Sequence, residues 1–575
     1  MHAIEHTYQY LLADIARMTG LPCVRASWDQ TFDWLLFEAP QLDKYLLRCL
    51  ECGDVINVDR FPAYLRSLVA RFVSDDNPDD LRLIRCLLLF CYKAEHTFSN
   101  EQVSSSYEVW VQANASCKEV QDRGFTSFDR DILDRARTHC TSTLSRGHWE
   151  DISPSHGPGA VAEADMNKGR WRKWFSTIDV IYPYHTFFYV GFDHWQDASD
   201  RLHVEDQIVC RMTPVPKDSR GPRLISVHPG ESMWIQKGLQ AELERVIGLP
   251  PRDKWAWPQG HVNFDDQTIN GQLALKASVT KEYATIDLSE ASDRLSDCLV
   301  QFIFGKYYRY FGCCRATAVN TRDGIQPLYC YAPMGNATTF PVQSLVYWSL
   351  CMSACEHLGV ANPNVYVFGD DIIVPSEACE ALSAILTTLG LKVNREKTFS
   401  RGSFRESCGV DAYKGVDVTP LRWKQPYDPL NLRDLLGLCN LGQRLRQQGF
   451  EETSCAVYSI VANRLWRWKR MRLFASNNPN HGGIAEYTRN PRPVFDGAYW
   501  HQRLQLWVTP VLRVLEVKSN FEDGWNHLLN SLALLAKKGP TYPDGAGRGG
   551  SPTRAPSRRS RLLRGWSPVL FGELE

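Results

Sequence analysis

The chain has 575 residues, of which 44% are hydrophobic and 23% carry a charge. These values are typical of globular proteins, so they exclude a largely disordered chain, and the length allows two to four folding units or one large enzyme. Because 65 Lys and Arg balance 65 Asp and Glu, the net charge neither supports nor excludes nucleic acid as a partner.

The first 200 residues are predicted to be mainly helical, with loops near 75–80 and 153–159. The apolar stretch 81–92 contains two arginines and is shorter than the ~20 residues that span a bilayer, so we expect a buried helix there. Because the N-terminus lacks a secretion signal, we expect a cytosolic protein with free thiols. Cys49 and Cys52 form the only Cys-x-x-Cys pair, and we interpret them as core cysteines rather than zinc ligands.

A basic segment follows at 213–225, where the sequence TPVPKDSRGPRLI predicts an extended arm. Lys217, Arg220 and Arg223 place three cations within seven residues around a rigid Gly-Pro. Such spacing suits contact with a triphosphate, because several donors can reach its oxygens together. A solvated basic loop is the alternative.

The next motif is a short strand that begins at Tyr283 and ends in Asp287. Ser289 or Ser292 could cap the helix that follows, and an acid at such a strand end can project into a cleft. Asp293, six residues further on, could face the same cleft from the first turn of that helix. Its alternative role is that of an acid that the helix dipole stabilises.

A glycine-containing loop at 333–338 then leads into a helix that runs to Glu356. Gly335 permits a close backbone approach or a positive φ. Asn336, Thr339 and Gln343 offer hydrogen bonds that could recognise a ribose hydroxyl. Taken alone, the same residues could simply begin a helix.

Residues 365–374 (VYVFGDDIIV) predict a β-hairpin with Gly369, Asp370 and Asp371 at its turn. Adjacent carboxylates repel each other, and a divalent cation offsets both that repulsion and the cost of desolvation. An ordinary solvated turn is the alternative. The apolar strands favour the metal interpretation, because they place the turn at the rim of a buried sheet.

The C-terminal part is predicted to be helical from 427 to 538. Within it, 460–474 interleaves five cations with two tryptophans, which fits an amphipathic helix packed over a core, or a contact with duplex RNA or a host protein. Residues 539–564 are rich in Gly, Pro, Ser and Arg, with six arginines against one acid, so we expect a flexible basic tail. That tail could be solubilising, or it could touch RNA or a partner.

The order of these motifs resembles the palm of viral RNA-directed RNA polymerases, and most closely that of the single-stranded RNA bacteriophage (levivirus, Qβ-type) replicases. The resemblance extends from Lys217 to Pro420. Its residues are Asp287-Leu-Ser-Glu-Ala-Ser-Asp293, Met334-Gly335-Asn336 with Thr339, Phe368-Gly369-Asp370-Asp371, Glu396-Lys397-Thr398-Phe399, Phe404-Arg405-Glu406-Ser407-Cys408-Gly409 and Gly415-Val-Asp-Val-Thr-Pro420.

The resemblance implies an α+β right-hand polymerase with an antiparallel-sheet palm and mainly helical fingers and thumb. The fingers would comprise 1–275 with 306–330 inserted, and the palm 276–305 and 331–425. The thumb would follow at 426–538, and the flexible tail would occupy 539–575.

The resemblance also implies the roles of single residues. Asp287 and Asp370 would bridge two Mg²⁺ ions, for which Mn²⁺ can substitute, and Asp371 would assist. Lys397 would protonate the leaving pyrophosphate, although Lys392 lies near it in the sequence. The residues implied to bind the ribonucleoside triphosphate are Lys217, Arg220 and Arg223 at the phosphates, and Asp293, Gly335, Asn336 and Thr339 around the ribose.

The implied partners are template and product RNA, the host translation elongation factors Tu and Ts, and a host ribosomal RNA-binding protein. The implied location is the cytoplasm of an infected bacterium, with no membrane contact. Two other functions stay open at this point. A reverse transcriptase usually carries an aromatic-x-Asp-Asp turn, whereas this chain has Phe368-Gly369-Asp370-Asp371. A non-catalytic RNA-binding protein could retain an inactive palm.

Overall fold

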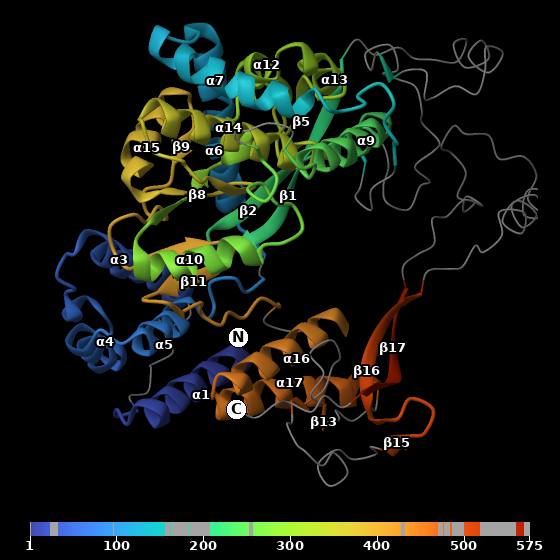
Figure 1. Ribbon diagram of the computed structural model, residues 1–575. Coiled ribbons are helices and arrows are strands. Elements are labelled where there is room, and N and C mark those ends of the chain that lie inside the picture. The colour runs from blue at the N-terminus through green and yellow to red at the C-terminus, as the bar shows by residue number, and fades with distance from the viewer. Residues whose placement is uncertain are drawn as a thin grey trace, which may run out of the picture.

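The computed structural model describes residues 2–23, 33–95, 97–155, 161–162, 183–184, 207–251, 257–426, 432–469, 475–476, 484–485, 499–517 and 559–568. These residues combine helices with several small sheets, which confirms the α+β class (Figure 1). They contain two hydrophobic cores: one surrounds the central sheets, and the other joins the N-terminal helices to the C-terminal ones.

Helices dominate the N-terminal part, as expected. They are α1 (His2–Thr19), α3 (Ala39–Cys52), α4 (Ala63–Asp75), α5 (Pro78–Leu89), α6 (Asn100–Arg123) and α7 (Ser127–Leu144), with a π-helical turn at Trp34–Glu38 and a 3₁₀ turn at Val58–Arg60. Helix α5 confirms the buried helix predicted at 81–92. It begins where the Asn77 side chain accepts a hydrogen bond from the Asp79 backbone N–H at 3.0 Å.

A four-stranded sheet contains the basic segment. Strands β1 (Val209–Asp218) and β2 (Gly221–Val227) form an antiparallel hairpin, which confirms the extended arm. Strand β1 also pairs in parallel with β5 (Ala318–Thr321), and β5 pairs with β6 (Gly324–Pro327). The sheet order is therefore β2-β1-β5-β6, so residues 318–327 lie beside the arm. Helix α9 (Gly230–Ile247) follows β2.

The central sheet is antiparallel, with the order β3 (Tyr283–Ile286), β8 (Asp371–Pro375) and β7 (Tyr366–Phe368). Helix α14 (Thr339–His357) contacts β7 and β8 and is buried over most of its length. The neighbouring elements are α10 (Thr268–Thr280), β4 (Leu288–Ser289), α11 (Ala291–Arg294), α12 (Asp297–Phe304), a 3₁₀ turn (Gly305–Tyr307), α13 (Tyr308–Gly312), a 3₁₀ turn (Ser376–Ala378), α15 (Cys379–Thr388), β9 (Lys392–Val393), β10 (Phe404–Ser407), β11 (Val410–Tyr413) and β12 (Val416–Asp417).

The C-terminal part corrects two expectations. Helices α16 (Leu432–Gln447) and α17 (Glu451–Lys469) are as predicted, but part of the remainder forms strands: β13 (Ala475–Ser476), β14 (Ile484–Ala485), β15 (Tyr499–His501), β16 (Leu506–Val517) and β17 (Arg559–Pro568). The helical prediction is therefore wrong for 506–517, and the flexible-tail prediction is wrong for 559–568. Strand β17 pairs with the whole of the Val- and Leu-rich β16 between Val508 and Val517, and a partner so far along the chain is not visible in local composition. The rest of 539–575 lies outside the described residues.

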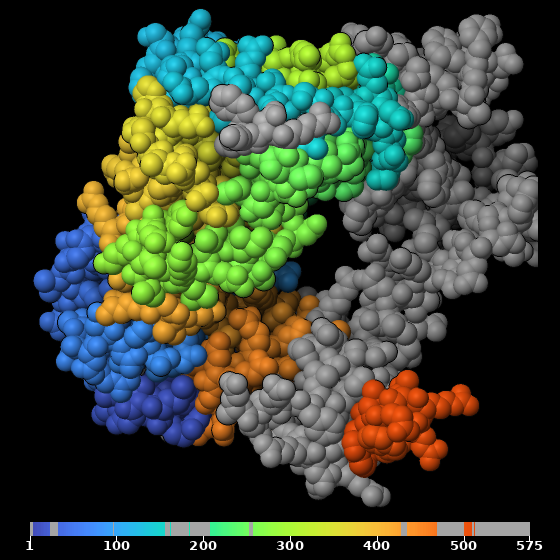
Figure 2. Space-filling view, viewed as in Figure 1, coloured from blue at the N-terminus to red at the C-terminus, as the bar shows by residue number. Residues whose placement is uncertain are grey.

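The first and the last described helices pack together. Asp14 on α1 is buried, and its carboxylate accepts hydrogen bonds from the backbone N–H groups of Glu452 and Thr453, at 3.2 and 2.8 Å, and from the Thr453 hydroxyl. These donors belong to the first turn of α17, so Asp14 caps that helix across the fold. Figure 2 shows the blue surface of the N-terminal helices directly beside the orange surface of α16 and α17.

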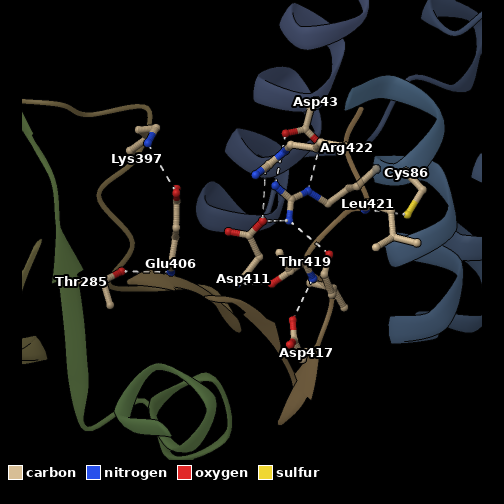
Figure 3. Close-up of polar contacts among 12 residues, drawn as sticks. Asp43, Cys86, Thr285, Lys397, Glu406, Asp411, Asp417, Thr419, Leu421 and Arg422 are labelled. Carbon is tan, nitrogen blue, oxygen red and sulfur yellow. Dashed lines mark hydrogen bonds and ion pairs between the residues drawn. The ribbon is translucent and has the colours of Figure 1, made fainter. Parts of the chain in front are cut away.

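A buried ion cluster joins the N-terminal helices to the β10–β11 hairpin (Figure 3). Arg85 on α5 contacts Asp43 on α3 at 2.9 Å and Asp411 on β11 at 2.8 Å, and all three side chains are almost wholly buried. Burial opposes the charge of Arg85, but Asp411 and Asp43 raise its pKa, so the guanidinium stays charged. Arg422 lies 3.8 Å from the same Asp411.

Candidate active site

The predicted Gly-Asp-Asp hairpin is present. Phe368 pairs with Asp371 across a two-residue turn made of Gly369 and Asp370, and Gly369 has a φ of 66°, which glycine adopts readily. Asp370 at this turn is exposed.

Helix α14 holds this turn in place. The Ser344 hydroxyl accepts a hydrogen bond from the Gly369 backbone N–H at 3.1 Å, and the Phe340 ring lies 5.1 Å from the Phe368 ring, centroid to centroid. The motif pattern did not reveal Phe340 and Ser344, although they lie one helical turn apart at the start of the predicted helix.

Asp287 lies at the end of β3, as the sequence predicted. Ile286 pairs with Ile372 in the sheet, so the next residue, Asp287, lies beside the Gly-Asp-Asp turn. Asn394 fixes it from the other side: its side-chain amide donates to a carboxylate oxygen of Asp287 at 2.7 Å, and its backbone N–H donates to the Asp287 carbonyl at 2.9 Å. Sequence reasoning missed Asn394, which lies three residues before the predicted Lys397.

The three aspartates repel one another. Burial raises the pKa of Asp287, and Asp370 adds to that rise, while Lys397 and Asn394 oppose it. Burial also raises the pKa of Asp371 to about 7, with further contributions from Asp370, Glu406 and Asp287. A bound cation would remove this repulsion, so the chemistry of the oxygen donors fits a hard divalent ion. Among the residues that the structure describes, no three His, Cys, Asp or Glu side chains are already gathered at metal-binding distances.

The β10–β11 hairpin adds two contacts to the aspartates. The Cys408 backbone N–H donates to an Asp371 carboxylate oxygen at 3.2 Å. Glu406 lies 3.4 Å from the Lys397 ammonium, and its own backbone N–H donates to the Thr285 hydroxyl on β3 (Figure 3). Glu406 foremost, with Asp287 and Asp371, raises the pKa of Lys397, so this lysine is a charged group next to the aspartates. Sequence reasoning assigned no role to Glu406.

Lys392, the alternative to Lys397, occupies a different position. It lies on β9, where its backbone pairs with Ser289, and its side chain is exposed. Lys397, in contrast, lowers the pKa of Asp287, and its own pKa is raised by Asp287 and Asp371. The structure therefore brings Lys397 to the aspartates.

The glycine loop packs against β2. Gly335 has a φ of 119°, and a Cβ atom added to it would lie 2.1 Å from the Ser226 carbonyl oxygen. The Ser226 backbone N–H also donates to the Met334 carbonyl at 2.8 Å. Glycine is therefore required here both for the backbone conformation and for the close approach of the loop to β2.

The polar residues of this loop are not equivalent. The Asn336 side-chain oxygen accepts from the Thr338 N–H and hydroxyl at 2.8 and 2.9 Å, whereas its buried Nδ2 has no hydrogen-bond partner among the residues that the structure describes. Within the same described part of the chain, Gln343 Oε1 is also buried without a partner. The Thr339 hydroxyl contacts the carbonyls of Ala332 and Pro333 at 3.2 and 3.1 Å. Thr339 therefore shapes the loop, whereas Asn336 retains an unused donor.

The basic arm reaches the same region. Burial, with Glu290 next, raises the pKa of Asp293 to about 7, and the cations of Arg223, Arg294 and Lys217 oppose that rise. Lys217 and Arg223 thus lie within electrostatic reach of Asp293. Arg220 behaves differently: its guanidinium binds both carboxylate oxygens of Asp218, at 3.0 and 2.8 Å, and lies over the Tyr92 ring.

We expect Gly335→Ala to destabilise the chain by about 2–3 kcal/mol, because positive-φ strain adds to a clash with backbone that cannot move aside. Gly324→Ala is the matched control, since Gly324 also has a positive φ of 99° but nothing lies within 4 Å of its added Cβ. The midpoint of urea unfolding measures both variants. Equal shifts for the two would show that the contact with Ser226 contributes nothing.

The family model described as RNA replicase, beta-chain, matches residues 170–469, which is more than half of the chain. The chain belongs to this replicase beta-chain family. The match includes the three aspartates, the glycine loop, the basic arm and Lys397.

Replicase relatives from several phages match parts of the chain. It is 40% identical over 209 residues to the RNA-directed RNA polymerase subunit beta of Escherichia virus Qbeta. The aligned region covers 36% of this chain and 34% of the Qbeta protein. It is 28% identical over 428 residues to the RNA-directed RNA polymerase beta chain of Enterobacteria phage fr. That aligned region covers 68% of this chain and 71% of the phage fr protein. The chain thus spans about a third of the length of the Qbeta relative.

Among solved structures, the chain matches an RNA-dependent RNA polymerase of BmCPV in its elongation state. The aligned region covers 71% of this replicase beta-chain homologue and 41% of the BmCPV chain. The TM-score is 0.36 and the sequence identity 11%. Similarity at this level carries no argument about function. Among the described helices of the replicase homologue, none combines the length and apolarity needed to cross a membrane.

Proposed function

We propose that the chain is an RNA-directed RNA polymerase that replicates a single-stranded RNA phage genome by two-metal-ion nucleotidyl transfer. The observation that carries this proposal is the meeting of Asp287, Asp370 and Asp371 at one end of an antiparallel sheet, where burial and mutual repulsion raise the pKa of two of them. A protein that only binds RNA gains nothing from such carboxylates, because they repel the phosphate backbone.

Asp287, Asp370 and Asp371 would hold two Mg²⁺ ions, or Mn²⁺ in their place. When bound, such ions activate the RNA 3′-hydroxyl and neutralise the charge on the triphosphate. Everything else falls to alignment by the protein. Asn394 orients Asp287, and Ser344 orients the turn that carries Asp370.

The remaining residues have separate tasks in this reaction. Lys217, Arg220 and Arg223 would bind the triphosphate, and Asp293 with the unused Nδ2 of Asn336 would recognise the ribose. As the 3′-oxygen forms its bond to the α-phosphorus and the bond to pyrophosphate breaks, Lys397 would donate a proton from Nζ to the leaving oxygen. Glu406 keeps Lys397 protonated and in place until then.

The proposed architecture is a right hand in which the central sheet is the palm. The fingers would comprise 1–275 and 306–330, the palm 276–305 and 331–425, and the thumb 426–538. Pairing of β5 with β1 supports the assignment of 306–330 to the fingers, since both segments share one sheet.

The chain would work with host proteins in the cytoplasm of an infected bacterium. The Qbeta relative is named as a subunit beta, which supports a multi-subunit enzyme. Elongation factors Tu and Ts and a ribosomal RNA-binding protein are the proposed partners. Co-purification from a bacterial host tests them, and an active enzyme recovered without host proteins would refute their requirement.

The polymerase itself is tested with purified protein, a single-stranded RNA template, four ribonucleotides and Mg²⁺. Labelled RNA product is the expected result. Incorporation of deoxyribonucleotides instead would identify a reverse transcriptase. If neither nucleotide set yields product even after host extract is added, the chain is a non-catalytic RNA-binding protein and the proposal fails.

We expect Arg220→Ala to raise the KM for nucleotides by roughly tenfold with little change in kcat, because the lost contact to phosphate forms equally in the ground and transition states. Lys306→Ala removes one exposed cation that belongs neither to the arm nor to the other proposed site residues, and it serves as the control. Steady-state incorporation at varied nucleotide concentration measures both. An unchanged KM with weaker template binding would move Arg220 from the triphosphate to the template, which its pairing with Asp218 also permits.

A further inference from the structure

A cavity of about 300 Å³ lies beside the basic arm, and the arm itself forms part of its lining. Lys93 and Phe98, which follow α5, form one wall, and Pro216 and Lys217 on β1 form another. Lys424, from the segment after β12, completes the lining. Three segments that are far apart in the sequence therefore each place a lysine at one cavity. Figure 2 shows that the molecular surface is hollowed between the green central segments and the orange C-terminal helices.

The cations at this cavity lack matching acids. None of the three lysine ammonium groups forms an ion pair within the part of the chain that the structure describes. Of the two acids in the wall, Asp218 is bound by both arms of the Arg220 guanidinium, so its charge is already compensated. Glu95 is the other. Three lysines that are exposed along their length, two of them with ammonium groups partly withdrawn from water, thus share a small space with one uncommitted carboxylate.

The electrostatic effect of this crowding is marked. The pKa of Lys93 is lowered to about 8, mainly because its ammonium group is partly withdrawn from water. The nearby cations of Arg422, Lys424 and Lys397 lower it further, and Asp218 opposes the change. Burial and the neighbouring Arg223 likewise lower the pKa of Lys217. Neighbouring cations destabilise one another in the free protein, and an anion bound between them removes that repulsion. The charges of the cavity therefore favour a ligand of high negative charge.

We propose that this cavity binds the polyphosphate chain of a nucleoside triphosphate outside the catalytic site, with Lys93 and Lys424 as phosphate ligands that extend the Lys217 site. The inference rests on the proposed polymerase function only for the identity of the nucleoside. The volume is at the lower end of small-molecule sites, which fits a compact anion. An RNA backbone would need an extended groove rather than a closed cluster of cations.

Lys217 connects the cavity to the reaction. It lines the cavity and also acts on Asp287 and Asp293, so one lysine can contact a phosphate at either place. A triphosphate that enters past Lys93 and Lys424 can therefore be transferred to the aspartates without losing all of its cationic contacts. The same route serves pyrophosphate on its way out.

The direct test is calorimetric titration of the purified full chain with inorganic tripolyphosphate and no divalent cation, so that the aspartates cannot contribute. We expect the variant with both Lys93→Ala and Lys424→Ala to bind at least roughly tenfold more weakly than the wild type. Lys306→Ala is the control for net charge, and Lys93→Arg, which keeps the cation, should retain binding. Near-ultraviolet circular dichroism checks the fold of each. Equal affinity of the double variant and the wild type overturns the proposal.

Kinetics then identify the source of the polyphosphate. A raised KM for nucleotides places the incoming triphosphate in the cavity, and weaker inhibition by pyrophosphate with unchanged KM places the product there. If instead the double variant changes only RNA affinity and its salt dependence, the cavity binds backbone phosphate and the proposal is wrong. Wild-type protein that binds tripolyphosphate but incorporates no nucleotide would refute the polymerase and leave the anion site standing.

The cavity also predicts a pH dependence. The Lys93 ammonium attracts phosphate below its pKa and is lost above it, so kcat/KM for nucleotides is expected to fall as the pH rises through about 8. Arg422, Lys424, Lys397, Lys217, Asp218 and Glu95 are the charged groups that face it. Lys93→Arg should remove this fall, because a guanidinium keeps its charge over that range. Identical pH profiles for the two proteins would contradict the role of Lys93.

Discussion

Asp370→Asn should lower nucleotide incorporation by roughly 10³-fold while template RNA stays bound. The substitution keeps the size of the side chain and removes one carboxylate from the set that would hold the metal ions. It leaves untouched the cations of the arm and cavity, which we propose bind phosphate. Labelled-nucleotide incorporation and filter binding of the template measure the two properties on one preparation.

The matched control is Asp323→Asn. Asp323 is an exposed acid in the two-residue turn of the β5–β6 hairpin, so it resembles Asp370 in local structure but lies on a different sheet. We expect it to keep full activity. Full activity of Asp370→Asn would end the metal assignment, and a joint loss of activity and RNA binding would point to damage to the fold instead.

Arg85→Met should destabilise the folded chain by about 3–5 kcal/mol, because it leaves the buried carboxylate of Asp43 unpaired and leaves Asp411 with only the more distant Arg422, at 3.8 Å. The midpoint of urea unfolding measures the loss. Arg82→Met on the same helix is the control, since Arg82 pairs with the exposed Asp79, and such surface pairs contribute at most about 1 kcal/mol.

A compensating variant separates charge from packing in this cluster. When Asp43→Leu and Asp411→Leu accompany Arg85→Met, the unpaired charges disappear and most of the stability should return. If the triple variant is no more stable than Arg85→Met alone, the loss comes from packing. Because Asp411 lies on β11, beside the strand that carries Glu406, incorporation by the triple variant also shows whether this cluster supports the site.

Much of the site could be predicted from sequence because its main features are local. A strand that ends in Asp287, a glycine loop before a helix, and a turn between apolar strands each leave a pattern within about ten residues. The structure places all three where that pattern indicated. The residue roles implied by the resemblance stay predictions until variants are measured.

Other features depended on distant partners and had no local pattern. Asn394 supports Asp287 from 107 positions away, and β17 completes a sheet with a strand some fifty residues earlier. The pairing of Arg220 with Asp218 was missed for another reason: spacing alone shows how close two charges are, but not whether the turn folds one onto the other. Long-range pairing and side-chain direction are set by the packed fold and not by nearby residues.

The capping of α17 by Asp14 has a consequence for how the chain is made. The two partners are 438 positions apart, so at a ribosome speed of about 5–20 residues per second roughly 20–90 s pass before the second emerges. During that interval α17 cannot yet cover the apolar face of α1, which includes Ile4, Tyr8 and Leu11. Nascent chains should therefore be most prone to aggregation until residues 451–469 have emerged, and a bound chaperone should leave only when α16 and α17 appear.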